Sequence, residues 1–275
     1  MRVQCEICPH HCKIEEGHVG LCKGRSNKNG EIISDNYGKI TGMALDPIEK
    51  KPLYHFYPRS KILSVGSYGC NLKCPFCQNC DISMVGGSEI ETAEISCEDL
   101  VQKAVALTDR GNIGIAYTYN EPLIGYEFIR DCATLAKHKG LKNVVVTNGY
   151  ICEEPLKELL PVIDAFNIDL KGFTQEYYHK LRGDLATVKR SIELAADVCH
   201  VEVTTLIVPG ENDSEKEMEK LSGWLASISP DIPLHISRFF PRWQMQDRDA
   251  TPVKQVYRLA QIARGNLNFV HEGNC

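Results

Sequence analysis

The sequence predicts an α/β fold, a partial (β/α)6 barrel of the TIM type with a small cysteine-rich extension at its N-terminus. From Lys61 onward, apolar strand patterns alternate with helical patterns, which is typical of βα units around a parallel sheet. About six units can be recognised, fewer than the eight that close a barrel. Residues 1–60 are instead dense in Cys, Gly, Lys and His. We therefore expect a metal-binding extension over residues 1–60 and the partial barrel over 61–275.

The expected elements follow one another in chain order. Apolar runs predict strands at 62–67, 113–118, 143–147, 165–170, 201–208 and 234–239, with 267–270 as a candidate edge strand. Helical patterns predict helices at 96–111, 122–140, 187–197, 214–228 and 252–265. Ser96 is an expected N-cap because Asp99 follows it by three residues, and Gly111 is an expected helix end.

Composition excludes several classes of protein. The chain has 275 residues, 43% of them hydrophobic and 24% charged, which suits a globular protein with a sizeable core. Its net charge is −5 and no basic stripe stands out, so we expect no nucleic-acid partner. We find neither a signal segment nor an apolar run of about 20 residues, so we expect a cytoplasmic protein without a membrane partner. Thirteen cysteines, an odd number, indicate a reducing compartment and metal chemistry.

The most informative motif is the C-x3-C-x2-C of Cys70, Cys74 and Cys77, directly after an expected strand. Three soft thiolates this close favour an iron–sulfur cluster, and three ligands leave one iron of a 4Fe–4S cluster open to a small molecule. A ferredoxin run beginning at Cys74 would need a cysteine at position 84, where the chain has Met84. Zinc would prefer paired C-x2-C knuckles.

A second set of cysteines lies in the N-terminal extension. Cys5, Cys8, Cys12 and Cys22 form C-x2-C-x3-C-x9-C, with three histidines interleaved. Four thiolates at short spacing indicate a second metal. Structural zinc and a second iron–sulfur cluster both remain open.

Polar motifs stand at the ends of the expected strands, where barrel enzymes place their sites. They are Asn120-Glu121, Thr147-Asn148-Gly149, Asp169-Leu170-Lys171 and Val208-Pro209-Gly210. Taken alone, Thr-Asn-Gly favours a turn, and Asp169 with Lys171 favours an ion pair. In the last predicted strand, His235 is expected to face the barrel interior.

These residues resemble a known family. Gly69-Cys70-x3-Cys74-x-Phe76-Cys77-Gln78-Asn79 resembles the signature of radical S-adenosylmethionine (SAM) enzymes, in the branch of the glycyl radical enzyme activating enzymes. Within that branch the chain is most similar to the AmmeMemoRadiSam group. The residues that carry this similarity are Asp46-Pro-Ile-Glu-Lys-Lys-Pro-Leu-Tyr-His-Phe56, Tyr119-Asn-Glu-Pro122, Thr147-Asn-Gly149 and Asp169-Leu-Lys171. The resemblance covers nearly the whole chain.

The resemblance implies a 4Fe–4S cluster on Cys70, Cys74 and Cys77, with SAM as the ligand of the open iron. Asn120 and Glu121 stand where relatives have Gly-Gly-Glu-Pro, so Glu121 is expected to accept a hydrogen bond from the ligand's ammonium group. The alternative for Glu121 is a helix N-terminal acid.

The other strand-end residues are expected contacts of the same ligand: Thr147, Asn148, Asp169, Lys171, Val208 on the adenine side, and His235 beside the adenosine or the substrate. Activating enzymes also use an Asp-Thr pair in a cation site. At this place the chain has Val146-Thr147 and lacks the acid, so the sequence does not decide whether a cation site is present.

The implied reaction is reductive cleavage of SAM to methionine and a 5′-deoxyadenosyl radical, which takes a hydrogen atom from a substrate. Flavodoxin or ferredoxin is the implied electron donor. A protein glycine is the expected substrate, with a small molecule or peptide as the alternative. The rival class is a cysteine-rich electron carrier or zinc-bound interaction module, against which Met84 and the strand-end motifs argue.

Overall fold

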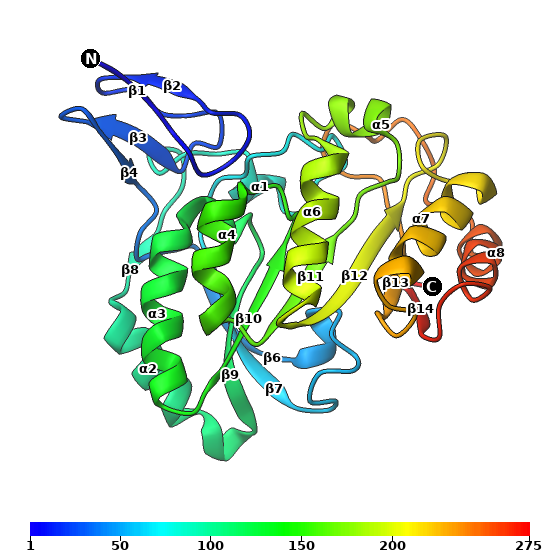
Figure 1. The fold of residues 1–275 in the computed structure, drawn as a ribbon. Coiled ribbons are helices and arrows are strands. Elements are labelled where there is room, and N and C mark those ends of the chain that lie inside the picture. The colour runs from blue at the N-terminus through cyan, green and yellow to red at the C-terminus, as the bar shows by residue number, and fades with distance from the viewer.

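A computed structural model describes residues 1–275 and has one eight-stranded sheet at its centre, in the order β14-β13-β12-β11-β10-β9-β7-β6. Every neighbouring pair is parallel except β6 with β7. The strands are β6 Gly42–Pro47, β7 Lys61–Gly66, β9 Asn112–Tyr117, β10 Lys142–Thr147, β11 Ala165–Asp169, β12 His200–Ile207, β13 Leu234–Arg238 and β14 Val270–Gly273. Helices cover the outer face of the curved sheet (Figure 1). The predicted α/β partial barrel is therefore confirmed.

The covering helices lie between successive strands. They are α2 Cys97–Ala106, α3 Tyr126–His138, α4 Glu153–Leu159, α5 Gln175–Lys180, α6 Leu185–Ala196, α7 Glu215–Ile228 and α8 Val253–Ala263, with a short α1, Cys80–Ser83. Ser96 caps α2 by accepting a hydrogen bond from the Asp99 N–H, as its spacing predicted. None of the helices is long and apolar enough to cross a membrane.

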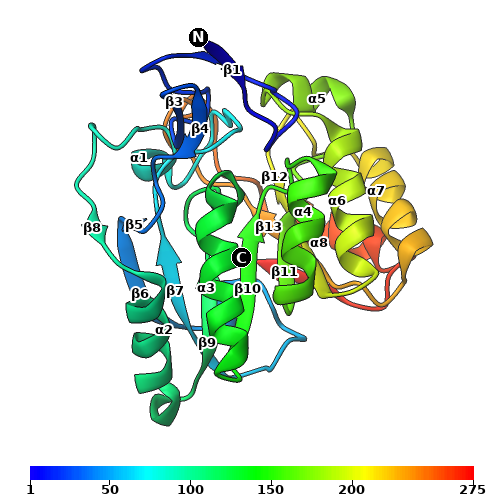
Figure 2. The same ribbon diagram turned by 60° about the vertical axis from the view of Figure 1, so that its left-hand side comes forward.

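The N-terminal residues form small two-stranded sheets over the end of the barrel at which α1 lies (Figure 2). Their strands are β1 Arg2–Gln4, β2 Lys13–Glu15, β3 Arg25–Lys28 and β4 Glu31–Ser34, and a further pair joins β5 Lys39–Ile40 to β8 Ala93–Glu94. The buried guanidinium of Arg25 ties this module to α3 through a bidentate ion pair with Glu127. The boundary between extension and barrel at residue 60 stays a prediction. Strand β6 precedes that boundary in the sequence but already belongs to the main sheet.

The six predicted strands agree with the structure to within a residue or two at each end. The candidate edge strand at 267–270 lies further on, at Val270–Gly273. The helix expected from Pro122 begins as a 3-10 turn, Pro122–Gly125, before α3 starts. The sequence patterns did not predict β1 to β6, β8 or the short helices α1, α4 and α5. Most residues of β6 are exposed, so it lacks the apolar run that marks the central strands.

The N-terminal end of the barrel is closed by the segment after β6. Ile48, Leu53 and Phe56 pack there against residues of β7, β9, β10 and β11, in an apolar cluster separate from the main core. Much of the Asp46–Phe56 motif is thereby explained as the barrel floor.

The floor also contains a buried carboxylate. Glu202 is fully buried and accepts four hydrogen bonds, from the side chains of His200 and His235 at 2.9 and 2.6 Å and from the backbone N–H groups of Tyr54 and His55. Burial opposes its ionisation, but these hydrogen bonds lower the pKa of Glu202 to about 2. Glu202 therefore stays charged and fastens the floor segment to β12 and β13.

We predict that Glu202→Gln lowers the free energy of unfolding by about 2–4 kcal/mol, because one charged acceptor serves four donors. The midpoint of urea unfolding at pH 7 measures this loss, with exposed Glu219→Gln as the matched control. Since the folded-state pKa is about 2 and the ordinary value 4.5, the carboxylate's contribution is present above pH 4.5 and is lost as the pH falls towards 2. Equal midpoints for both variants would contradict this role.

Candidate active site

An open cavity of about 360 Å³ lies inside the barrel at the C-terminal ends of the strands. Most of the predicted site residues line it: Cys70, Cys74, Cys77, Asn120, Glu121, Thr147, Asn148, Asp169 and Lys171. These residues come from the segments after β7, β9, β10 and β11, so the parallel sheet brings together motifs that are far apart in the sequence.

The cysteine loop is irregular and is held from behind by backbone bonds. The N–H of Cys70 donates to the carbonyl of Cys22 at 3.1 Å, and the N–H of Lys73 donates to the carbonyl of Leu181 at 2.9 Å. Gly69, just before the loop, has a φ of +87° and its Cα lies against the Cys22 carbonyl, so a side chain there would clash. The backbone at the start of the cysteine loop is therefore tightly packed against the N-terminal segment.

Asn120 fixes the start of the same loop. Its side-chain amide donates to the carbonyls of Tyr68 and Gly69 at 3.1 and 3.2 Å, and its Oδ1 accepts from the Ser67 N–H at 2.9 Å. The amide is thus occupied by the backbone that leads into Cys70. Asn120 lines the cavity, but its side chain holds the loop.

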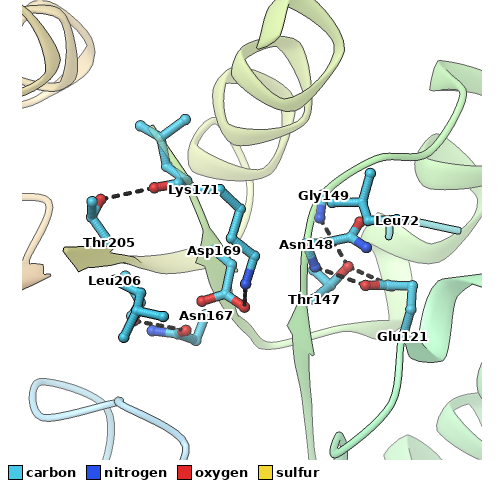
Figure 3. A network of polar contacts seen from close by, with 12 residues as sticks. Leu72, Glu121, Thr147, Asn148, Gly149, Asn167, Asp169, Lys171, Thr205 and Leu206 are labelled. Atoms are coloured by element: carbon cyan, nitrogen blue, oxygen red, sulfur yellow. Dashed lines mark hydrogen bonds and ion pairs between the residues drawn. The ribbon is translucent and has the colours of Figure 1, made fainter. Parts of the chain in front are cut away.

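Glu121 is at the centre of a hydrogen-bond network (Figure 3). Its Oε1 accepts from the Thr147 hydroxyl at 2.6 Å and the Leu123 N–H at 3.0 Å, and its Oε2 accepts from the Asn148 N–H at 2.8 Å. Glu121 is 3% exposed, and burial raises its pKa to about 7 against the effect of these bonds. The bond to Leu123 caps the following turn, so the helix-capping role exists. Oε2 also has acceptor capacity left for a cation in the cavity.

Thr147-Asn148-Gly149 is the turn that its composition favoured. Gly149 has a φ of +68°, and Asn148 Oδ1 accepts from the Tyr150 N–H at 2.8 Å. Asn148 also donates from Nδ2 to Asn71 Oδ1 at 2.9 Å, with Cys70 Sγ at 3.7 Å. The turn thereby joins the glutamate network to the cysteine loop.

Asp169 and Lys171 form an ion pair of 2.7 Å inside the cavity (Figure 3). Burial alone would lower the pKa of Lys171, but Asp169 and the nearby Cys74 raise it overall. A fixed cation thus lies beside the cysteines, and Asp169 keeps an exposed oxygen towards the cavity, since its side chain is 30% exposed.

The cysteine set suits a cluster better than a single ion. Burial raises the pKa of the Cys74 thiol to about 12, so the free thiol is protonated, and a soft metal would displace that proton. Nowhere in the chain do three or more His, Cys, Asp or Glu side chains converge closely enough to hold one ion. Three sulfurs spread over the wall of one cavity fit a polynuclear iron–sulfur centre, whose irons are bound separately.

The cavity wall carries a second polar group that the sequence patterns did not predict. Lys51 is 3% exposed, pairs with Asp46 at 2.9 Å and lies over the Tyr119 ring, whose hydroxyl donates to Asp46 at 2.8 Å. Burial opposes ionisation of Asp46, but Lys51 and Tyr119 lower its pKa overall. Asp46 and Lys51 belonged to a recognised motif, but only the fold brings them to Tyr119.

Two predicted contacts lie outside the cavity. Val208 is fully buried in the main core and its N–H donates to Asn212 Oδ1 at 2.7 Å. His235 faces the barrel interior, as the alternation of side chains along the strand predicted, but it lies one layer of side chains below the cavity. It bonds Glu202 in the floor, whereas Ser237, two residues on, lines the cavity. His235 therefore has a structural partner in Glu202, and its expected contact with the ligand stays a prediction.

The N-terminal cysteines line a cavity of their own. Cys5, Cys8, Cys12 and Cys22 meet there with His10, Arg25 and a few apolar side chains, directly behind the cysteine loop. The structure thus gathers all four predicted thiols at one place.

Comparison with known proteins gives the family. The pattern of the Radical SAM superfamily matches residues 64–222. An uncharacterized protein of Methanocaldococcus jannaschii is 40% identical over 99% of this chain and 81% of its own length. The pyruvate formate-lyase 1-activating enzyme of Escherichia coli is 27% identical over 56% of this chain and 63% of its own. A radical SAM methyltransferase from Sphaerobacter thermophilus has the same fold, with a TM-score of 0.61, 18% identity, and coverage of 79% of this chain and 67% of its own. This chain belongs to the radical SAM superfamily and is related to the pyruvate formate-lyase activating enzymes.

Proposed function

We propose that this radical SAM enzyme generates a 5′-deoxyadenosyl radical in the barrel cavity and uses it to take a hydrogen atom from a protein glycine, as an activating enzyme of the AmmeMemoRadiSam type. The observation that carries the proposal is that the three cysteines, the Glu121 network and the Asp169–Lys171 pair line one cavity. When bound, a 4Fe–4S cluster and SAM supply the electron and the radical precursor.

In this proposal each polar group has one task. Cys70, Cys74 and Cys77 hold the cluster, and Glu121 Oε2 accepts a hydrogen bond from the ammonium of SAM. Thr147 and Asn148 orient Glu121. Asp169 and Lys171 form the polar wall on the next strand, with Lys171 placing positive charge beside the cysteines.

The substrate and donor are inferred from relatives. Similarity to pyruvate formate-lyase activating enzymes supports a protein glycine as substrate, and a low-potential flavodoxin or ferredoxin as electron donor. The Asp46–Phe56 motif supports the AmmeMemoRadiSam assignment. The cysteine content supports a reducing cytoplasm. The N-terminal cysteines are a proposed second metal site, for zinc or iron–sulfur.

Anaerobic reconstitution with iron and sulfide, followed by SAM and dithionite, tests the reaction class. We expect methionine and 5′-deoxyadenosine in equal amounts, measured by chromatography. The triple variant Cys70/Cys74/Cys77→Ala should form neither product and should lose one cluster's worth of iron, because its catalytic thiolates are gone. Full cleavage and unchanged iron in the triple variant would reject this assignment.

Glu121→Gln is expected to weaken SAM binding by about 1–3 kcal/mol, the value of a hydrogen bond to a charged group, while the cluster still assembles. Equilibrium dialysis measures affinity, and iron content with the thermal midpoint separates binding from folding. Glu215→Gln, an acid in the first turn of α7 outside the cavity, is the matched control. If SAM affinity is unchanged while the thermal midpoint falls, Glu121 serves only as a cap.

Isotope transfer tests the substrate class. A glycyl radical enzyme prepared with α-deuterated glycine should pass deuterium from its glycine Cα to the 5′-deoxyadenosine, since the abstracted atom ends in that product. Mass spectrometry of the nucleoside measures it. Cleavage of SAM without deuterium transfer would leave the reaction class intact and turn the search to a small molecule or peptide.

A further inference from the structure

The N-terminal cysteine cavity is lined by four thiols and by one imidazole, that of His10. Cys5, Cys8 and Cys12 lie on the segment between β1 and β2, and Cys22 lies between β2 and β3. The interleaved histidines have other partners. His10 Nε2 bonds the Asn71 carbonyl at 2.8 Å, and His11 Nδ1 bonds Glu6 at 2.8 Å on the surface. Four thiols beside an imidazole that is held on the Asn71 carbonyl make a soft site, suited to zinc or to an iron–sulfur cluster.

The arrangement of the four sulfurs favours the cluster. All four side chains line the same cavity, yet no three of them converge closely enough for one ion. Zinc binds its four thiolates at one atom, at about 2.3 Å each, whereas a cluster takes each thiolate at a different iron. The set Cys70, Cys74 and Cys77 likewise lines one cavity without converging on a single ion.

A buried donor without a partner gives the second observation. Arg25 lines the cysteine cavity and is 4% exposed. Its Nη atoms bond Glu127 and the Ile124 carbonyl, but its Nε–H has no hydrogen-bond partner. An unpaired buried N–H is costly, and a cluster sulfur or thiolate in this cavity is an acceptor of the required kind.

The cavity also lies directly against the catalytic loop. The Cys22 carbonyl accepts the Cys70 N–H at 3.1 Å, so one residue of each cysteine set is joined to the other by a single hydrogen bond. Asn71 adds a second link. Its carbonyl bonds His10, and its Oδ1 bonds Asn148, which lies beside Cys70 Sγ.

We propose that Cys5, Cys8, Cys12 and Cys22 bind a second 4Fe–4S cluster, with the Arg25 Nε–H donating to one of its sulfurs. Four protein thiolates leave no iron open, so this cluster does not bind SAM. The inference deepens the proposed function by defining its N-terminal metal, but its test is metal content and spectroscopy, which do not require turnover.

The triple variant Cys70/Cys74/Cys77→Ala isolates the N-terminal site without altering it. After anaerobic reconstitution we expect about four irons and four sulfides per chain, the content of one such cluster. After dithionite reduction, its electron paramagnetic resonance signal should be unchanged by SAM. Zinc without sulfide, no bound metal, or a signal that shifts with SAM would each overturn the inference.

The intact protein tests the position of the cluster. Two reduced clusters whose cysteine loops are joined by one hydrogen bond should interact magnetically. The fully reduced protein should therefore give a broadened, fast-relaxing spectrum. This spectrum should become simpler when either cysteine set is removed. The variant Cys5/Cys8/Cys12→Ala, which leaves a single thiol of this set, should remove the interaction, whereas the control Cys199→Ala, outside both cavities, should retain it. Two non-interacting signals would contradict the placement. If Cys5/Cys8/Cys12→Ala does not fold, the Cys70/Cys74/Cys77→Ala variant still decides the identity of the metal.

Arg25→Lys tests the hydrogen bond. It keeps a cation opposite Glu127 but removes Nε–H, so the N-terminal cluster should become harder to reduce, because hydrogen bonds to sulfur raise the reduction potential. A redox titration of this substitution in the triple-variant background measures the shift. An unchanged potential would contradict the assignment of Arg25.

Discussion

The site depends on keeping an irregular cysteine loop in one position. A loop has no ladder of its own hydrogen bonds, so its neighbours must fix it. Four do so: Asn120 after β9, Asn148 after β10, the Leu181 carbonyl after α5, and the Cys22 carbonyl of the N-terminal module. The barrel thus supplies three of the supports and the module supplies the fourth. This explains why a cysteine-rich extension is packed against the mouth of the barrel.

Glu121 illustrates how one buried carboxylate can serve structure and chemistry together. Its three hydrogen bonds hold it in a fixed orientation, and its burial makes an isolated charge unfavourable, as its raised pKa of about 7 indicates. A ligand cation in the cavity relieves that cost. The donors are in place before the ligand arrives, so binding needs little reorganisation. Lys171 is likewise in place before the ligand arrives, because Asp169 keeps it charged.

The sequence was sufficient for the parallel strands, the long helices and most of the cavity, because each depends on local patterns and on the rule that strand ends meet at one edge. The other features depend on how deep a side chain lies in the barrel and on pairing between segments far apart in the sequence. Alternation places His235 inside the barrel, but only the register with Thr204 shows that it lies beside Glu202, one layer below the cavity. Likewise, β6 is mostly exposed, and Lys51 and Tyr119 meet across 68 residues of chain only after β6 pairs with β7.

The central claim is that SAM binds through its amino and carboxylate groups at the open iron of a cluster on Cys70, Cys74 and Cys77, beside Glu121. Electron–nuclear double resonance of the reduced protein with SAM labelled by ¹⁵N at its amino group measures this contact directly. We expect a ¹⁵N coupling to the cluster spin in the intact protein. A SAM-bound, reduced protein without such coupling would contradict this mode of SAM binding.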